Sequence, residues 1–170
     1  KDNTILKIQG TLKMPANSPD WSSVLTNADT TNGNSGVSID FTGGVFDGNR
    51  SNQTGNIHHV PALFINCSNF NIFGGKYGKN YAPETTPSSH PLSPFDQGVQ
   101  YGEGSALYPT VGMITFHGGR ANHVHDFNLV DWSQEGVSLR WNEGSSVTNF
   151  RAINGIETPE IYYTTVTFGS

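Results

Sequence analysis

The sequence has few charged residues, a single cysteine and no long hydrophobic run. Only 14% of its 170 residues are charged, the net charge is −5, and no basic run exists, so a nucleic-acid partner is not expected, because it would require a stripe of Lys and Arg. Cys67 has no second cysteine to pair with, which excludes an internal disulfide and paired-cysteine metal sites. We expect a buried, inert thiol. No apolar run reaches the length of a membrane span, and the start, "KDNTILKIQG", does not have the pattern of a signal peptide.

Glycine and asparagine are abundant instead. The chain has 20 Gly and 17 Asn, and both residues favour turns, which argues against a helical bundle. Aromatic residues make up 11% of the chain and apolar residues come in regular bursts, which argues against disorder. A chain of 170 residues predicts one domain, 1–170.

The apolar bursts alternate with polar residues, as in short half-buried strands. "ALFINCSNFNIFGGKYGKN", 62–80, is an example: bursts of a few residues are separated by Asn, Ser or Gly. Equivalent bursts occur in 36–49, 112–118 and 136–144. The residues that the alternation places on one buried side are Val37, Ile39 and Phe41; Leu63, Ile65 and Cys67; Ile114 and Phe116; and Val137, Leu139 and Trp141.

The bursts recur at a regular interval along the chain. Ile65 follows Ile39 by 26 positions, Leu139 follows Ile114 by 25, and Val147 follows Val124 by 23. The longer interval from Ile65 to Ile114 contains 81–110, which is rich in Pro and has no periodicity. We expect this segment to be a long loop that projects from the body.

This pattern predicts an all-β fold, a parallel β-solenoid with coils of about 23–26 residues. Each coil alone cannot bury its apolar face, whereas stacked coils form a continuous core. Gly and Asn then occupy the tight corners, since both tolerate positive φ. The alternative is an antiparallel β-sandwich, whose strands recur at a much shorter interval, roughly every 8–12 residues.

Two segments resemble the coils of a known superfamily. "GGVFDGN" and "NCSNFNIFGGKYGKN", together with "NTILKIQGTLKMP" before them, are similar to the pectate-lyase-like right-handed parallel β-helix superfamily, which includes polysaccharide lyases, polygalacturonase-like hydrolases and phage tailspikes. The resemblance covers roughly 3–80 and 113–156. It implies a right-handed parallel β-helix outside the cell, secreted or on a virion surface, and, for a tailspike, a homotrimer.

The sequence also departs from this superfamily. The usual N-terminal capping helix, the paired "DD" of polygalacturonase-like sites and an epimerase-type "DPH" are missing, and there are fewer coils. The chain therefore looks like a fragment or a short member. An uncovered end exposes apolar side chains and unpaired backbone. We therefore expect it to be covered by the last strand, "EIYYTTVTF", by the loop 81–110, or by another chain, as in end-to-end self-association.

Candidate site residues come from the outward positions and from 118–136. An outward column of Asp40, Asn66, Thr115 and Arg140 is expected, in which Arg140 would hold a uronate carboxylate; the simpler interpretation is a solvated face with some charge pairing. His123 and His125 flank Val124 and so share one face of a strand. Two such histidines can bind a metal, but no third ligand is identifiable, and ordinary surface histidines are the simpler interpretation. No cofactor is expected, although calcium could neutralise a uronate.

Two reactions are open. Glycoside hydrolysis needs two carboxyl groups, which Asp126, Asp131 and Glu135 could supply among themselves or with Asp47 or Glu143. A lyase needs a base and a group that neutralises the uronate, for which Arg120, Arg140, His123 and His125 are candidates. Trp132, Tyr101 and Tyr108 could stack on sugar rings, whereas Trp141 is expected in the core. The predicted catalytic residues are Asp126, Asp131, Glu135 and Arg140, and the predicted substrate-binding residues are Arg120, His123, His125, Trp132 and Tyr101.

The sequence thus predicts an extracellular β-helix that recognises polysaccharide and is open to two further roles. It could also cleave the polymer, as a tailspike depolymerase, a lyase or a glycoside hydrolase. Alternatively it is a non-catalytic structural or adhesive segment of a viral fibre or surface appendage. Fold resemblance alone does not decide between these roles.

Overall fold

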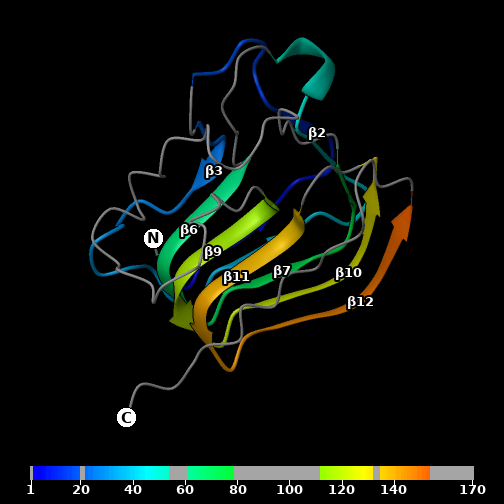
Figure 1. Cartoon of the computed structure of the whole chain (residues 1–170). Helices are drawn as coiled ribbons and strands as arrows, with labels where there is room; N and C mark the ends of the chain where they lie inside the picture. The colour runs from blue at the N-terminus through cyan, green and yellow to red at the C-terminus, as the bar shows by residue number, and fades with distance from the viewer. Residues whose placement is uncertain (1, 20–21, 54–60, 79–111, 132–134, 154–170) are drawn as a thin grey trace, which may run out of the picture.

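The computed structural model describes residues 2–19, 22–53, 61–78, 112–131 and 135–153 (Figure 1). Apart from one short 3₁₀ helix, the regular structure in these residues is β. The elements are β1 (Ile5–Lys7), β2 (Thr11–Lys13), β3 (Leu25–Thr26), β4 (Ser38–Asp40), β5 (Val45–Asp47), η1 (Arg50–Asn52), β6 (Ala62–Ser68), β7 (Asn71–Phe73), β8 (Lys76–Gly78), β9 (Gly112–Arg120), β10 (His123–Val130), β11 (Glu135–Glu143) and β12 (Ser146–Ile153).

The strands form two parallel sheets. In sheet A the order is β1-β4-β7-β10-β8-β5-β2, with β12 paired to β10, and in sheet B it is β11-β9-β6-β3. Every strand pairing within the described part of the chain is parallel. The all-β prediction is confirmed, and the antiparallel sandwich is wrong, because no described strand returns beside its sequence neighbour.

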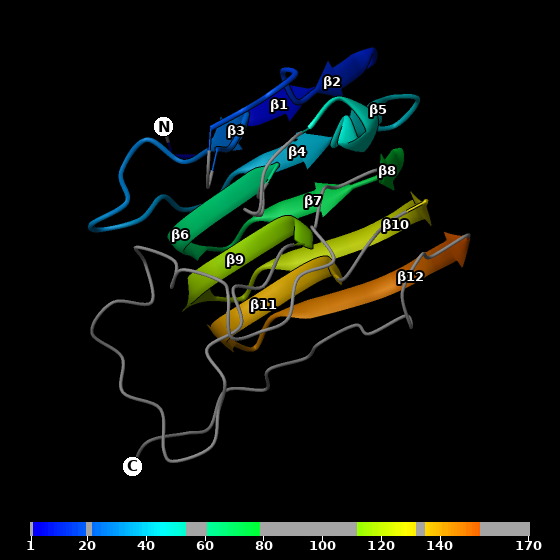
Figure 2. The same ribbon diagram turned by 45° about the horizontal axis from the view of Figure 1, so that its top comes forward.

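The chain alternates between the sheets and rises by one strand each time. It passes through sheet A in two short strands or one long one, crosses to sheet B, and returns to sheet A beside its earlier strands (Figure 2). We call each pass a level. Level 1 contains β1, β2 and β3; level 2 contains β4, β5 and β6; level 3 contains β7, β8 and β9; level 4 contains β10 and β11; level 5 contains β12.

The register of sheet A corrects the predicted repeat. One inner row runs through Leu6, Ile39, Ile72, Val124 and Val147, so successive members are 33, 33, 52 and 23 positions apart in the chain. The predicted repeat from Val124 to Val147 is confirmed. The Ile39–Ile65 interval is wrong as a repeat, because it compares a strand of sheet A with one of sheet B. The Ile114–Leu139 interval is wrong as well, because Ile114 pairs with Val137, 23 positions away. The expected loop, 81–110, and the expected last strand, "EIYYTTVTF", lie outside the described residues.

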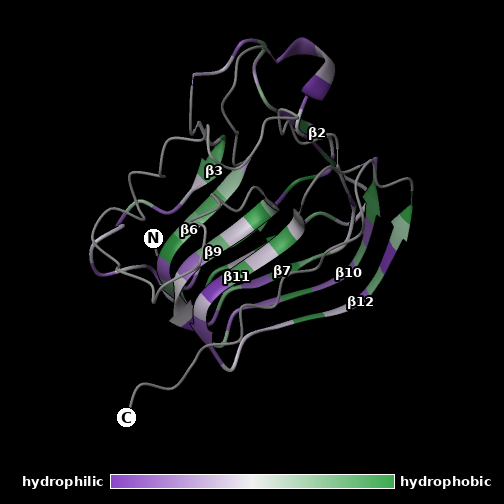
Figure 3. Ribbon diagram, in the orientation of Figure 1, coloured by the Kyte–Doolittle hydropathy of each residue, from purple (hydrophilic) through white to green (hydrophobic). Residues whose placement is uncertain are grey.

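The two sheets share one core. Ile39, Ile72 and Val124 from sheet A are buried in the same cluster as Phe64, Phe116 and Leu139 from sheet B. A series of aromatic rings follows the levels through this core. Phe41 contacts Tyr77 edge-on, Tyr77 stacks on Phe127, and Phe127 stacks on Phe150, with ring centres 5.3, 4.9 and 5.4 Å apart. Apolar and polar residues alternate along the strands (Figure 3). Stacking thus buries rows of side chains that no single level could bury.

Residues with positive φ line the corners, as the abundance of Gly and Asn predicts. At the corner that leads into sheet A, equivalent residues of all five levels are left-handed. Each of the first four donates its N–H to the carbonyl before the next corner residue, as in Asn69 to Arg120 at 3.0 Å. Only glycine adopts this conformation at little cost, and asparagine tolerates it better than most residues. The corner residues are Asn3, Gly36, Asn69, Ala121 and Gly144, with φ of 52°, 69°, 56°, 51° and 59°.

A second left-handed column shifts the alternation of sheet B. Asn66, Gly118 and Trp141 occupy equivalent positions and have φ of 54°, 75° and 47°. Such a residue adds one position to the strand, so Phe64 and Cys67 both face the core while Leu63 and Ile65 form a separate cluster on the outer side. The prediction that Leu63 and Ile65 face the core with Cys67 is therefore wrong.

Cys67 and Asn122 occupy the interior beside this column. Cys67 is a buried free thiol, as predicted, and burial raises its pKa. Asn122 is fully buried: its Oδ1 accepts the Phe70 N–H at 3.1 Å, and its Nδ2 donates to the Cys67 carbonyl at 2.9 Å and to Asn142 Oδ1 at 2.7 Å. This amide therefore ties the end of level 2 and the start of level 3 to level 4, where the chain crosses from sheet B to sheet A.

The expected outward column of Asp40, Asn66, Thr115 and Arg140 does not exist. Asp40 belongs to sheet A and pairs with Lys7 and Phe73. Thr115 in sheet B pairs with Leu63 and is 3% exposed, and Arg140 lies one row away. Because β4 and β6 lie in different sheets, the column joined positions that the fold separates.

Candidate functional site

The largest group of predicted site residues lies on the outer face of sheet A, over β4, β7, the N-terminal half of β10 and the start of β12. Here the inner row of Ile39, Ile72 and Val124 is buried, so the residues on either side of it point outward. Strand neighbours lie about 4.8 Å apart, which aligns their outward side chains in two rows. We call these rows the polar ladder: Ser38, Asn71, His123 and Ser146 in one row, and Asp40, Phe73, His125 and Thr148 in the other.

His125 lies at the centre of the polar ladder. Its Nδ1 lies 2.6 Å from Asp126 Oδ2, its Nε2 lies 2.8 Å from Asn71 Oδ1, and its ring stacks on Phe73 at 5.5 Å with an interplanar angle of 15°. Both ring nitrogens therefore have a polar partner, and the orientation of the ring is fixed.

Asp126 is held as a carboxylate at the bend of β10. It has φ 57°, and Asn149, which stacks on it in level 5 with φ 48°, donates its Nδ2 to Asp126 Oδ1. The hydrogen bond from His125, followed by that from Asn149, lowers the pKa of Asp126 below its ordinary value. A carboxyl group with a lowered pKa is ionised at neutral pH, which suits an acceptor or a base and not a general acid.

His123 and His125 share one face of β10, as predicted. The Nδ1 of His123 lies 2.8 Å from Ser146 Oγ, in the row next to that of His125. Within the described part of the chain, no group of three His, Cys, Asp or Glu side chains could hold a metal ion. The described residues therefore provide no third ligand, and calcium stays a prediction.

A charge pair occupies the first levels of the same face. Lys7 Nζ lies 3.8 Å from Asp40 Oδ2. Hydrogen bonds from the Thr42 side chain and backbone, and then the charge of Lys7, lower the pKa of Asp40. Charge pairing is expected from the sequence within a column that joins Asp40 to Arg140; the partner of Asp40 is instead Lys7 in β1, so the pair links levels 1 and 2.

Asp131 lies at the far end of β10, away from Asp126. The two residues are five positions apart, which corresponds to roughly 15 Å of strand. Asp131 has φ 53° and lines a shallow pocket of about 230 Å³ together with Asp47, Lys76 and Gly78. Asp47, a candidate partner for a carboxylate pair, is therefore nearer to Asp131 than Asp126 is.

The predicted arginines lie in sheet B. Arg120 is exposed at the end of β9, in register with Ser68 and Glu143. The guanidinium of Arg140 lies 5.9 Å from the centre of the Trp141 ring, and His117 meets the same ring edge-on at 4.5 Å.

Trp141 is half-buried in this group, so the expectation that it fills the core is wrong. The left-handed conformation at this position turns the Trp141 side chain away from the core, whereas Leu139, two residues earlier, belongs to the core cluster.

The structure therefore divides the predicted site residues into separate groups. His123 and His125 belong to the polar ladder, with Asp126 directly beside them. Asp131 lines the pocket, and Arg120 and Arg140 lie in the other sheet. Glu135 is the first residue of β11, while Trp132, Tyr101 and Tyr108 lie outside the described residues.

Sequence reasoning missed five residues of the polar ladder and one beside it: Ser38, Asn71, Phe73, Ser146 and Thr148, and Asn149. The repeat from Val124 to Val147 would have placed Ser146 beside His123 and Asn149 beside Asp126. Asn71 and Phe73 reach β10 only through the 52-residue interval from Ile72 to Val124, which no repeat in the sequence reveals.

Comparisons with known proteins give no relative: no protein-family model, no curated protein and no solved structure matches this chain. The resemblance to pectate-lyase-like proteins is therefore an expectation from the sequence alone. Among the described residues, no helix has the length and apolar character needed to cross a membrane.

Proposed function

We propose that the chain is a right-handed parallel β-helix whose outer face on sheet A binds polysaccharide outside the cell. The repeated passage between two parallel sheets supports the β-helix, as do the columns of left-handed residues that stack at equivalent corners. Both features are what a solenoid requires, because each level must turn in the same way as the level beneath it.

The observation that carries the binding role is the polar ladder. It presents amide, hydroxyl, imidazole and carboxylate groups from four successive levels at a regular spacing of about 4.8 Å. A polymer that repeats its hydroxyl groups along its length can bind such a regular array at many points. Phe73 and the stacked ring of His125 add an apolar surface against which a sugar ring can pack.

Binding is supported better than cleavage. Hydrolysis needs two carboxyl groups no more than about 9.5 Å apart, and Asp126 and Asp131 are separated by roughly 15 Å of strand. Asp47 and Asp131, which line one pocket away from the ladder, stay a candidate pair for hydrolysis. Arg140, the proposed partner of a uronate, belongs to the other sheet. Lyase or glycosidase activity remains a proposal that the binding experiment can include.

The test is a binding and cleavage assay with acidic and neutral polysaccharides. We expect retention on at least one polymer, and at least a fivefold loss of affinity in His123→Ala and in Phe73→Ala. Glu143→Gln is the control: it changes an exposed carboxylate of β11 that belongs to neither row of the ladder, and it should bind like the unmodified chain. New reducing ends with new unsaturation would indicate a lyase, and reducing ends alone a hydrolase. If no polymer is retained, or if both ladder variants bind normally, the proposal fails.

One observation favours the structural alternative. Ile5 is 80% exposed, and Leu6 is 39% exposed although its row partners Ile39 and Ile72 are buried. A surface of this kind can stack against another chain, so a homotrimer or end-to-end assembly is the second proposal. Light scattering tests it: self-association that Ile5→Lys abolishes would support it, and a monomer at all concentrations would contradict it.

A further inference from the structure

A second feature of sheet A lies apart from the polar ladder, at the far end of β5, β8 and β10. Asp47, Gly78 and Val130 stand in one row there, next to the buried row of Phe46, Tyr77 and Leu129. Gly78 has no side chain, and the backbone of Val130 packs directly against its Cα. Both residues line the pocket of about 230 Å³, which we call the Gly78 notch: Val45, Phe46, Asp47, Lys76, Tyr77, Gly78, Val130 and Asp131.

Close packing of backbone fixes the floor of the notch. A Cβ atom added to Gly78 would overlap the Val130 carbonyl oxygen, which no side chain can tolerate. The neighbouring strands approach so closely at this point that only glycine fits. The floor of the notch is therefore backbone, and its walls are the side chains of adjacent rows.

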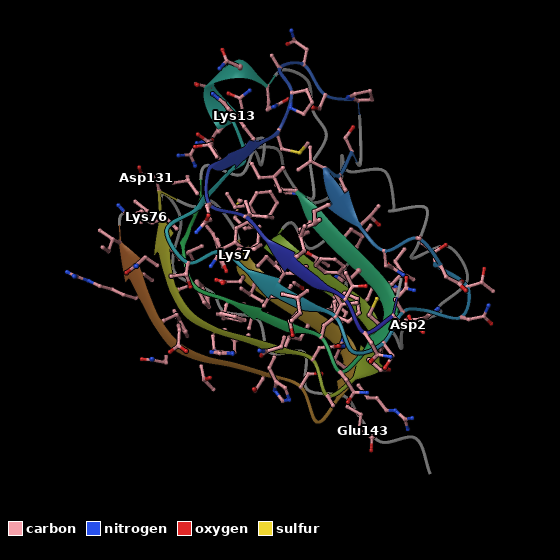
Figure 4. The ribbon with its side chains drawn as sticks, turned by 180° about the vertical axis from the view of Figure 1, so that it is seen from behind. Asp2, Lys7, Lys13, Lys76, Asp131 and Glu143 are labelled. Carbon is pink, nitrogen blue, oxygen red and sulfur yellow. The ribbon has the colours of Figure 1, made fainter. Side chains whose placement is uncertain are left out.

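The walls combine charged and apolar groups. The lining residues include Asp131, Lys76, and Asp47, whose Oδ1 also accepts the Asn49 N–H at 2.7 Å. Val45, which is 36% exposed, adds an apolar surface. Lys13 precedes Asp47 by one level in the same row, and Figure 4 shows Lys13, Lys76 and Asp131 gathered at one end of the molecule, with Glu143 at the other.

We propose that the Gly78 notch binds one uncharged sugar unit, and this inference rests on the proposed binding of polysaccharide. The carboxylates accept hydrogen bonds from sugar hydroxyls and Lys76 donates to a ring or hydroxyl oxygen. Val45 and Val130 contact the apolar face of the ring. The volume is below the roughly 300 Å³ of the smallest typical ligand pockets, which limits the occupant to about one ring.

The balance of charge selects the class of sugar. The lining residues carry two carboxylates and one ammonium group, and Lys13 adjoins Asp47 in the same row, so the notch has no excess of positive charge to favour a uronate carboxylate. The notch thus complements the polar ladder, from which it is separated by roughly 15 Å of β10. The occupant of the notch is thus a neutral sugar unit, whereas the sugar expected at Arg140 is a uronate.

The experiment is a titration followed by backbone amide NMR. Methyl glucoside, methyl galactoside and glucuronate are added separately, then an uncharged and an acidic polysaccharide. Amide signals of Lys76, Gly78 and Asp131 report on the notch, while those of Phe73, His123 and His125 report on the ladder. We expect a neutral methyl glycoside to shift the notch signals, with a dissociation constant in the millimolar range and weaker binding of glucuronate.

Two variants and one control test the residues. Asp131→Asn retains the shape and the tolerance of positive φ but loses a charged acceptor, so affinity at the notch should fall about tenfold. Val45→Phe should obstruct the notch from an exposed position. Glu143→Gln removes the same charge at the opposite end of the molecule and should change nothing.

Each outcome supports or overturns the inference. Shifts at the notch with neutral sugars that Asp131→Asn weakens support it, whether or not the ladder responds. Shifts confined to the ladder overturn the inference and leave the proposed function intact. No shift in either region overturns both. Tighter binding of glucuronate than of neutral sugars, or the same notch shifts with calcium alone, also overturns it.

Discussion

The outer faces of sheets A and B share one stacking geometry but differ in chemistry and exposure. On sheet A the polar ladder includes the exposed His123 and Thr148. On sheet B the equivalent outward positions are buried, with Leu63 8%, Thr115 3% and Ser138 0% exposed. Both faces arise from parallel strands at the same spacing. The difference teaches that the levels determine where side chains align, while the residues at the outward positions determine what each face can do.

The largest expected effect concerns a residue that joins the two sheets. In Asn122→Ala, the buried Phe70 N–H and Cys67 carbonyl lose their partner, and each unsatisfied group costs about 1–3 kcal/mol. We expect the free energy of unfolding to fall by roughly 3 kcal/mol or more, measured by urea denaturation. Asn128→Ala, in an outward row of sheet A, should stay within about 0.5 kcal/mol. Equal effects of the two changes would show that the bridging amide is not required.

A second pair of variants tests the two outer faces directly. Leu63→Ala on sheet B removes a buried side chain and should cost about 2–3 kcal/mol. Thr148→Ala at an exposed outward position of sheet A should change stability by less than about 0.5 kcal/mol. Denaturation midpoints at constant slope measure both. If Leu63→Ala proves as mild as Thr148→Ala, the two faces do not differ in the way that their exposure indicates.

The same contrast explains what the sequence could predict. The abundance of Gly and Asn predicted corners with positive φ, which is confirmed. Alternating apolar residues predicted short strands, which is confirmed for β1–β5, β7 and β8, whereas β9–β12 have eight or nine residues. The shared face of His123 and His125 followed from strand alternation and is also confirmed. These features depend on neighbours within a few positions of the chain.

Features that depend on register between levels were not predictable. Ile39 pairs with Ile72 and not with Ile65, because Ile39 in β4 and Ile72 in β7 belong to sheet A, whereas Ile65 in β6 belongs to sheet B. The left-handed Asn66 reverses the alternation of β6 at a single residue, and no signal in the sequence distinguishes it from other asparagines. The Gly78 notch depends on the approach of Val130, which is 52 positions away in the chain.

A third, smaller effect tests the corners that connect sheet B to sheet A. Gly144 and Ala121 occupy equivalent corners with φ of 59° and 51°. Gly144→Ala should lower the free energy of unfolding by about 1 kcal/mol, although nothing lies within 4 Å of the added Cβ, because only the conformation is strained. Ala121→Gly should raise it by up to about 1 kcal/mol. Gly10→Ala, which has open space and no positive φ, is the control. If the free energy of unfolding changes in the same direction in Gly144→Ala and Ala121→Gly, the prediction is wrong.

The smallest expected effect is a pH dependence confined to the polar ladder. The pKa of Asp126 is lowered in the folded chain by His125 and Asn149, so unfolding raises the affinity of this carboxyl group for a proton. Its contribution to stability is therefore fully present above its ordinary pKa of 3.8 and is lost as the pH falls through the lower folded value. Asp126→Asn should remove this contribution, so the difference in denaturation midpoint between the unmodified chain and the variant should shrink as the pH falls from 5 toward 2.5. Asp40, whose pKa is lowered on the same face by Thr42 and Lys7, remains in both chains and cancels in the difference. A difference that is constant across this range would mean that His125 and Asn149 do not hold Asp126 in its charged form, and the ladder would lose its fixed carboxylate.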